Sequence, residues 1–518
     1  MKNKIKYRMK ICILGGGTAG WTAALYIQKR QPEHEIVVVE SSRIGIIGTG
    51  EGTTGLFPDV MTKVLKITEE DFIVNTGATQ KLGNRFHNWR GDGRSFIAPL
   101  DNTHTSLSLQ DTTLLYHCRY VGRDQLHLTT QCGQLAERGL TSFRYDGAEV
   151  LPINGYHFDG HLVGAYFRKL SVAQGAQVVD SEYTHCERRE DGSVAKIHLA
   201  NQDSIEADVF IDATGFARCL GREVGAGWHS YTDSLSCDRA MPFQLPHLPT
   251  IDALTEAHAL SSGWMWRIPV QQRRGCGYVF DSDFITPDQA QEEIETVLGH
   301  PIEPIKVIKF ESGRVEQTFC HNVVTIGLAG CFLEPLQATN LHGTLIQIHN
   351  MVEYWLRPWG IAGPVEAEHL NQEITRVFDD FANLIQIHYH GGRSDTDFWR
   401  YQQTIPLLPH TATIREICQH RWPTQDDWRA KIGGAGYGVS IYPMVEYGWL
   451  DQPIQREQIR DLQAAEQQYR RELDHAEEIS RGAMNNTVLV NRLRTQGAIR
   501  PAPTRLTPEL RRLLELGR

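Results

Sequence analysis

The stretch Ile11-Cys12-Ile13-Leu14-Gly15-Gly16-Gly17-Thr18-Ala19-Gly20 decides the fold of this 518-residue chain. Its four apolar residues predict a short buried strand, and its glycines predict a tight turn into a helix. The helical pattern continues over residues 21–29, and a second apolar run at residues 36–39 ends at Glu40. Strand, glycine turn, helix, strand and acidic residue in this order predict a dinucleotide-binding unit.

The turn and the acidic residue have separate tasks in such a unit. Backbone N–H groups at the start of the helix hold a pyrophosphate, and Glu40 stands where a ribose-binding acid is expected. A glycine turn without a ligand is the alternative, and the complete context disfavours it. We therefore assign cofactor binding to Gly15, Gly17, Thr18, Ala19, Gly20 and Glu40.

Two later segments predict further buried strands that end in small residues. Residues 207–215 finish with Asp-Ala-Thr-Gly, which is equally an ordinary exit from a strand into a turn. Residues 322–330 lead through a tight turn into a helical run at about residues 342–355. A strand, a turn and a helix N-terminus together attract anions through free N–H groups and the helix dipole.

The composition excludes several classes of protein. Hydrophobic residues make up 41% and charged residues 22% of the chain, and the net charge is −10. These values are typical of a globular protein and disfavour nucleic acid or an anionic membrane as the main partner. The ten cysteines contain no C-x-x-C, and the histidines show no metal-ligand spacing, so we expect reduced thiols, a cytoplasmic location and no metal.

The basic N-terminus imitates a secretion signal but does not match one. Five Lys or Arg residues precede residues 11–14, an apolar run too short for a signal core. We interpret it as a lead-in to the first strand, and no segment of the sequence is long enough to span a membrane.

The stretch Gly263-Trp264-Met265-Trp266-Arg267-Ile268-Pro269 places two of the 11 tryptophans one residue apart. Strand side chains alternate, so both indoles are expected on one face, where they form a rigid wall. A core strand that uses Trp for bulk is the plain alternative. A wall that separates a reactive intermediate from an organic molecule is the functional one.

The order of the motifs is similar to that of FAD-binding proteins of the flavin monooxygenase or glutathione reductase type, and this resemblance implies an α/β fold with a Rossmann-like core. We expect an additional sheet and a mostly helical C-terminal part. Residues 1–355 are assigned to the core, with a substrate-side insertion at about 85–150, and residues 356–518 to the helical part. Amphipathic helices are expected at residues 365–387, 455–479 and 506–516.

The motifs in this order resemble the flavin-dependent halogenases of the tryptophan halogenase family. The resemblance covers about residues 9–400, and its two specific elements are Trp-x-Trp-x-Ile-Pro at 264–269 and the lysine motif at 77–83. Both in the right order are very unlikely to arise by chance. The other matching segments are residues 15–20, 49–53, 156–160, 213–216, 327–339 and 391–399.

The resemblance implies a reaction. FAD, reduced by a separate NADH-dependent reductase, reacts with O₂ to give a flavin hydroperoxide, and a bound halide converts this to hypohalous acid. The acid travels through a tunnel to the lysine, here Lys81, which forms a haloamine or polarises the acid by hydrogen bonding. An electron-rich aromatic carbon is then halogenated. A lysine suits this role because the pKa of its amine changes readily when the amine is desolvated. Outside this motif, the simpler interpretation would be a surface lysine at the start of a helix.

The segment after the third strand departs from the family pattern. The family reads Glu-Pro-Leu-Glu-Ser-Thr-Gly, and this chain has Gln337 at the place of the second, catalytic glutamate. A glutamine accepts no proton at neutral pH but still orients an electrophile. Three explanations are open. Glu334 or another acid takes over the role of the base, the substrate is activated and needs no strong base, or the chain is catalytically weak. We favour the second option and assign Lys81, Gln337 and Glu334 to the catalytic site.

The same segment implies an anion site. Thr339 and Asn340 match the family's halide-binding Thr-Gly pair, and Asn keeps the backbone N–H and tolerates a left-handed backbone. The sequence does not decide whether the bound halide is chloride, bromide or iodide. The remaining residues assigned to the cofactor are Gly50, Glu51, Asp212, Gly215, Leu328 and Leu341, and Trp264 and Trp266 are assigned to the partition.

The substrate side departs as well. A family segment His-Pro-Phe that clamps the indole is replaced here by Ala98, Pro99 and Leu100. Tyr442, Tyr447 and Trp449 are candidate replacements, with helix packing as the equal alternative. We therefore expect a small indole- or phenol-like aromatic rather than free tryptophan. The competing functions are an FAD-dependent hydroxylase and a degenerate flavoprotein, and a homo-oligomer is left open.

Overall fold

The first strand of the chain lies at the centre of a six-stranded sheet with the order β20-β21-β12-β1-β2-β8. The computed structural model describes residues 8–45, 48, 50–101, 114–144, 154–430, 433–434, 436–456 and 459–496. Five of the six strands run parallel, and β20 joins the edge antiparallel. The strands are β1 (Lys10–Leu14), β2 (Glu35–Glu40), β8 (Gln177–Asp180), β12 (Val209–Asp212), β20 (Phe319–Cys320) and β21 (Val323–Thr325).

Both faces of this sheet are covered, as its continuous apolar strands require. Ile11 and Ile13 belong to the largest hydrophobic core together with α1 (Thr18–Arg30), which packs against α6 (Gly160–Ala173). Cys12 and Leu14 face the other way, into a second core. That core is closed by β9 (Tyr183–Arg188), β10 (Val194–Leu199), β11 (Ser204–Glu206) and α7 (Cys219–Glu223).

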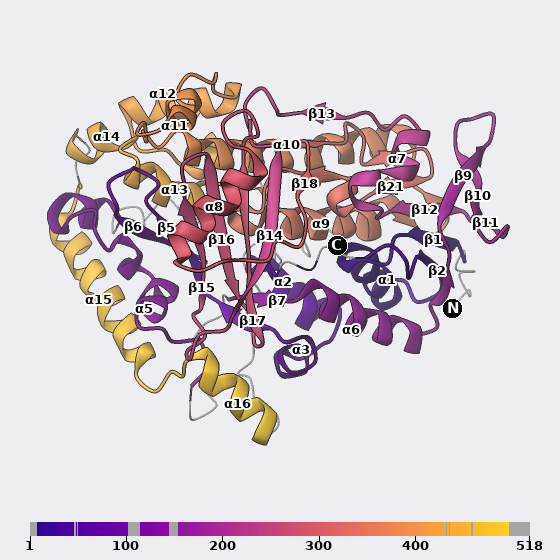
Figure 1. Ribbon diagram of the computed structural model, residues 1–518, viewed down its shortest axis with the longest axis horizontal. Helices are drawn as coiled ribbons and strands as arrows, with labels where there is room; N and C mark the ends of the chain where they lie inside the picture. Colours follow the sequence, from indigo (N-terminus) through magenta and orange to yellow (C-terminus); the bar gives the residue numbers. More distant parts are fainter. Residues whose placement is uncertain are drawn as a thin grey trace.

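A seven-stranded sheet forms the middle of the molecule (Figure 1). Its inner face carries side chains of the largest core, and its outer face is partly covered by α8 (Pro287–Leu298). Its strands, in order, are β18 (Ile308–Lys309), β14 (Arg239–Pro246), β17 (Arg273–Phe280), β16 (Gly263–Pro269), β15 (Leu254–Ala259), β5 (Gly83–His87) and β6 (Ser95–Pro99).

A small sheet joins the two large ones. Its order is β3 (Glu51–Gly52), β7 (Gly155–Phe158) and β4 (Thr79–Lys81), so β7 lies between the segments that carry Glu51 and Lys81. The remaining elements before residue 340 are α2 (Leu56–Asp59), α3 (Glu69–Thr76), α5 (Gln131–Glu137), β13 (His229–Ser230), β19 (Gly313–Arg314) and β22 (Cys331–Phe332).

Helices dominate after residue 338. The six-stranded sheet lies at one end of the molecule, and α14 and α15 lie at the other (Figure 1). The elements are α9 (Thr339–Asn350), β23 (Leu356–Arg357), β24 (Gly360–Ile361), α10 (Pro364–Tyr389), α11 (Asp397–Gln402), α12 (Pro409–His420), α13 (Tyr437–Glu446), α14 (Asp451–Arg456), α15 (Leu462–Ser480) and α16 (Asn486–Gln496).

The predicted fold class is confirmed: a Rossmann-like core, an additional sheet and a helical C-terminal part. The single helix expected at residues 455–479 is instead two, because α14 ends at Arg456 and α15 begins after Asp461, which caps it. The helix expected at residues 506–516 lies outside the described residues. The domain boundary at residue 356 stays a prediction, and the largest core draws residues from both sides of it. Over the described ranges, no helix combines the length and apolar character that a membrane crossing needs.

Candidate functional site

The glycine turn is shaped for a dinucleotide. Gly15 has a φ of 116°, and a Cβ there would lie 2.3 Å from the carbonyl oxygen of Ala213. A Cβ on Gly20 would lie 2.0 Å from the carbonyl oxygen of Gly15, whereas a Cβ on Gly17 would meet no atom within 4 Å. No side chain caps α1 at Gly17, so the N–H groups at the start of the helix receive no side-chain acceptor from this position. The turn therefore fits a bound pyrophosphate.

Glu40 stands at the end of β2, beside the turn. Its carboxylate accepts hydrogen bonds from Trp21 Nε1 at 3.1 Å and from Arg168 Nε at 2.7 Å. A Cβ on Gly16 would lie 2.1 Å from Glu40 Oε2, so the carboxylate covers the turn closely. The structure thus places Glu40 where the sequence predicts it, held by two side chains that orient it.

The other strand ends converge on the same turn. A Cβ on Gly327, the residue before Leu328, would lie 2.8 Å from the Ala19 side chain. Gly215 has a φ of 63°, and its missing Cβ would meet nothing within 4 Å. The Asp212 carboxylate instead accepts from the backbone N–H groups of Thr214 and Gly221, so it stabilises its own turn.

Glu51 connects the turn to the small sheet. Burial raises the pKa of Glu51 to about 7, the charge of Asp159 adds to this, and a hydrogen bond with Thr18 opposes it. A Cβ on the neighbouring Gly50 would lie 3.4 Å from Ile268 at the end of β16. A cavity of about 600 Å³ lies beside this segment, lined by Gly45, Gly48, Asp159, His161, Leu162, Gln244, Gln272, Arg273, Ile305 and Lys306.

Lys81 is buried on the inner side of the molecule, with an exposed fraction of 1%. A Cβ on Gly52 would lie 3.1 Å from Lys81 Nζ and 3.4 Å from Thr255 Oγ1, which places the amine beside β15. Within the described ranges, no carboxylate forms an ion pair with it. Burial alone lowers the pKa of Lys81 to about 7. The amine is therefore close to half neutral at physiological pH.

A clamp from the far end of the chain holds the lysine strand. The side chain of Asn486 accepts from the backbone N–H of Gln80 at 2.8 Å and donates to its carbonyl at 2.9 Å. The side chain of Gln80 accepts from the backbone N–H of Ser142 at 2.6 Å. Sequence reasoning missed this clamp, because no spacing connects residue 80 to residue 486.

Trp264 and Trp266 lie on one face of the seven-stranded sheet, as strand alternation predicts. Trp264 and Trp266 belong to the same core, their ring centroids are 6.1 Å apart, and both are buried. Ala257 pairs with Trp266 in the ladder, and Thr255 points to the same face as Ala257, so the Lys81 amine near Thr255 lies over the face that carries the indoles. Gly277 leaves room for the Trp266 ring, because a Cβ there would lie 2.2 Å from it.

Glu334 holds this wall rather than joining the lysine. Its Oε2 atom accepts from Trp264 Nε1 and from Tyr389 Oη, each at 2.8 Å. Burial raises the pKa of Glu334 to about 7. The carboxyl group therefore fixes the orientation of one indole, which the sequence did not show.

Gln337 takes part in a directional hydrogen-bond chain. Asn84 Nδ2 donates to Gln337 Oε1 at 2.8 Å, and Gln337 Nε2 lies 3.2 Å from His388 Nε2. His388 Nδ1 lies 2.9 Å from Tyr447 Oη. Burial lowers the pKa of His388 to about 3, so the ring is neutral, accepts at Nε2 and donates at Nδ1.

The turn before α9 creates an anion-attracting end. Gln337 and Ala338 both have left-handed backbones, with φ of 63° and 58°, so the strain lies there, whereas Asn340 is helical. Thr339 is the first residue of α9, and its buried hydroxyl has no hydrogen-bond partner among the residues that the structure describes. An unpaired hydroxyl beside free helical N–H groups fits a bound halide. Leu341 is buried in the first turn of α9.

Aromatic rings lie around His388, the hydrogen-bond partner of Gln337. Phe86 stacks between Phe96 and His388, with centroid distances of 4.9 and 4.5 Å, and Tyr447 meets Phe96 edge-on. Ala98 is buried in the strand of Phe96. Of these rings, the sequence had named only Tyr447 as a binding candidate, because the others come from β5, β6 and α10 and share no spacing.

A glycine turn that fits a dinucleotide, two buried indoles on one face of a sheet and a buried lysine together indicate an oxidoreductase with a nucleotide cofactor. The sequence matches the tryptophan halogenase family over residues 10–437. The chain belongs to this family of flavin-dependent halogenases.

Relatives of known activity agree with this assignment. The tryptophan 7-halogenase RebH of Lentzea aerocolonigenes is 30% identical over 423 residues, which cover 77% of this chain and 79% of that protein. A 7-chloro-L-tryptophan 6-halogenase of Kutzneria sp. (strain 744) is 30% identical over 450 residues, 80% of this chain and 84% of that protein. The solved structure of a tryptophan C-6 flavin-dependent halogenase from taromycin biosynthesis superposes with a TM-score of 0.85 at 25% identity. The superposition covers 94% of this chain and 100% of the chain in that structure.

Proposed function

We propose that the protein halogenates a small electron-rich aromatic, indole- or phenol-like, with Lys81 as the residue that delivers the halogen. The observation that carries this proposal is the state of Lys81: a buried amine with a pKa lowered to about 7 and no carboxylate paired with it in the described part of the chain. Bound FAD, supplied reduced by a separate NADH-dependent reductase, is the group that lets O₂ oxidise a halide to hypohalous acid.

The halide end of the site is assigned to α9. The unpaired Thr339 hydroxyl and the backbone N–H of Asn340 are the donors, and the helix dipole adds a partial positive charge. Such a site recognises charge and size, so chloride, bromide and iodide are all candidates.

The indole wall is assigned to separation. Trp264 and Trp266 present two buried rings on one face, and Glu334 locks the first ring through its N–H. An aromatic substrate that cannot pass this wall is protected from direct oxygen transfer, while the small hypohalous acid passes. This separation favours halogenation over hydroxylation.

The step at Lys81 has two balanced forms. In the first, the neutral amine attacks the halogen of the hypohalous acid, an N–halogen bond forms, the halogen–oxygen bond breaks, and hydroxide leaves with the amine proton as water. In the second, the ammonium form donates a hydrogen bond to the acid and polarises it. In both, the aromatic carbon takes the halogen and then loses its ring proton. A pKa of about 7 allows either form.

Gln337 is assigned to orientation. Its amide is held between Asn84 and His388, and neither it nor a histidine with a pKa near 3 is an effective base at neutral pH. We therefore propose a substrate activated enough to release its proton without one. The relatives named above act on tryptophan or a chlorinated tryptophan, so tryptophan itself belongs among the substrates to be tested.

The test is product analysis with the full chain, FAD, NADH and a flavin reductase. A panel of indoles, phenols and free tryptophan is supplied with each of the three halides, and products are identified by mass spectrometry. The Lys81→Met variant is expected to lose at least about a thousandfold in halogenation while it still binds FAD. The exposed Lys169 on α6 provides a matched control, since Lys169→Met leaves the rate unchanged.

The competing functions predict different products. An FAD-dependent hydroxylase gives hydroxylated aromatics that do not depend on halide or on Lys81. A degenerate flavoprotein gives hydrogen peroxide and no modified aromatic with any member of the panel. Either pattern overturns the proposal.

A further inference from the structure

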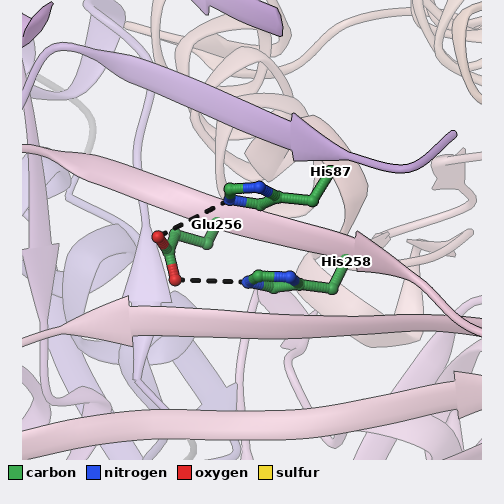
Figure 2. A group of neighbouring side chains, drawn as sticks. All are labelled: His87, Glu256 and His258. Carbon is green, nitrogen blue, oxygen red and sulfur yellow. Dashed lines mark hydrogen bonds and ion pairs between the residues drawn. The ribbon is translucent and has the colours of Figure 1, made fainter. Parts of the chain in front are cut away.

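The outer face of the seven-stranded sheet carries a compact group of nitrogen and oxygen ligands. His87 at the end of β5 pairs in register with His258 on β15, and their rings stack at a centroid distance of 4.0 Å. The Glu256 carboxylate reaches both rings: Oε2 lies 3.2 Å from His258 Nε2, and Oε1 lies 3.6 Å from His87 Nε2 (Figure 2). These three ligand atoms lie within 4.8 Å of one another, and no other group of three or more His, Cys, Asp or Glu side chains in the described part of the chain comes together in this way.

The group lies apart from the catalytic chemistry. Strand alternation points residues 256 and 258 outward, whereas Thr255 and Ala257 point to the inner face with Lys81 and the indoles. The three side chains are between 19% and 24% exposed, so the group lies near the surface of the protein. Nothing in the proposed halogenation uses them.

The ring of His87 is oriented as that of a metal ligand. Ser95 Oγ lies 2.7 Å from His87 Nδ1, which ties down one nitrogen and turns the other toward Glu256. His87 Nε2 is buried and forms no hydrogen bond within the described part of the protein. Histidine ligands characteristically bond through one nitrogen while the other is held by a neighbouring group.

The surrounding charges select the kind of ion. Arg267 lies 3.7 Å and Arg85 4.0 Å from the Glu256 carboxylate, and Asp252 partly offsets Arg85 at 3.4 Å. Two guanidinium groups disfavour a hard cation that is held by charge, such as Ca²⁺ or Mg²⁺. Two imidazoles and one carboxylate favour a borderline ion that bonds well to nitrogen.

We propose that His87, Glu256 and His258 form a binding site for a divalent transition-metal ion of the Zn²⁺ type. The ligands are one Nε2 atom from each imidazole and a carboxylate oxygen, with water at the remaining position. Because the ligands come from β5 and β15, a bound ion staples these neighbouring strands together. The spacing of the histidines in the sequence led us to expect no metal, and this proposal differs from that expectation. The two histidines are 171 residues apart in sequence and come together only through the parallel pairing of β5 with β15.

The test is Zn²⁺ binding to the metal-stripped full chain, with its purification tag removed, measured by calorimetry and by the visible absorbance of Co²⁺ as a substitute. We expect one ion per chain and a higher Tm in its presence. His258→Ala is expected to weaken binding by about 10–100-fold or more and to abolish the rise in Tm.

The chain contains a matched control. His185 and His198 also stack, at 4.4 Å, and His198 lies 2.8 Å from Glu187, yet these side chains do not present three converging ligand atoms. His198→Ala is therefore expected to keep full Zn²⁺ affinity.

A second variant protects the result against misfolding. Glu256→Gln keeps the shape of the side chain and is expected to weaken Zn²⁺ binding and to remove the Co²⁺ spectrum of the site. The proposal is overturned if the wild-type chain binds no more Zn²⁺ than His258→Ala and Glu256→Gln, or if His198→Ala removes the bound ion.

Discussion

The cofactor turn and the lysine site are built in opposite ways. The turn is local: β1, the glycines, α1 and Glu40 all lie within residues 10–40. The lysine site is assembled from distant segments, because Lys81 Nζ and Thr255 Oγ1 both lie near Gly52, and Asn486 holds the backbone of Gln80 in the same strand as Lys81. A local motif carries its geometry in its spacing, whereas an assembled site depends on the whole fold. The two regions should therefore respond differently to single substitutions.

Apart from the loss of halogenation in Lys81→Met, the largest effect is expected at the turn. Gly17→Ala adds a methyl group where the structure has open space, so the fold tolerates it, but the group occupies the room that a pyrophosphate needs. We expect FAD affinity to fall by about 10–100-fold with a change in Tm of only a few degrees. Fluorescence titration with FAD and calorimetry measure the two quantities.

Gly363 provides the control for this substitution. It also precedes a helix, and its missing Cβ also meets nothing within 4 Å. Gly363→Ala is expected to leave FAD binding intact. Equal affinity in Gly17→Ala and the wild type would show that no cofactor occupies the turn.

The next largest effect is expected at the indole wall, where one substitution should change both the stability of the fold and the yield of halogenated product. Glu334→Ala leaves the Trp264 N–H and the Tyr389 hydroxyl buried without their acceptor. We expect a loss of about 2 kcal/mol in the free energy of unfolding and more hydrogen peroxide per halogenated product. Chemical denaturation and peroxide assays check both. Glu334→Gln keeps a hydrogen-bond acceptor, so its stability and its peroxide yield should lie between those of the wild type and of Glu334→Ala. A Glu334→Ala enzyme that formed no more hydrogen peroxide per halogenated product than the wild type would contradict the assigned role.

This contrast also explains what the sequence could predict. The βαβ unit, the shared face of Trp264 and Trp266 and the helical C-terminal part follow from local patterns with fixed periods. The stacking of Phe86 on His388 and the clamp at Asn486 depend on which distant elements pack together, and one sequence holds no record of that. Glu334 shows the boundary: its place in the motif was visible, but its hydrogen bond to Trp264 was not.

Lys81 gives a pH-dependent prediction of moderate size. Its pKa is lowered in the folded state to about 7 from a usual 10.5, so between these values the unfolded chain binds more protons. This group therefore makes the free energy of unfolding rise with pH from 7 to about 10.5. In Lys81→Met this rise is smaller, and the variant is more stable at pH 7 by a few kcal/mol at most, at about 1.4 kcal/mol per pKa unit.

The halogenation rate should show an inflection at the same pKa. A rate that increases through pH 7 identifies the neutral amine as the reactive form, and one that decreases identifies the ammonium form. A flat profile from pH 6 to 8, together with an unchanged pH dependence of unfolding in Lys81→Met, would mean that the amine does not titrate in this range.

The smallest effect is expected at Gln337, where the chain departs from its family. Gln337→Glu places a carboxylate beside His388 Nε2, so the ring must either gain a proton or change its tautomer, and a change of tautomer reverses the hydrogen bond with Tyr447. If the substrate needs no strong base, the halogenation rate changes by less than about tenfold. A gain of a hundredfold or more would show that the wild-type site lacks a base.

Gln337→Leu separates orientation from basicity, because it removes the hydrogen bond from Asn84 without adding a charge. A rate that falls in Gln337→Leu and hardly moves in Gln337→Glu assigns Gln337 to orientation, and this pattern requires that the aromatic substrate itself is activated.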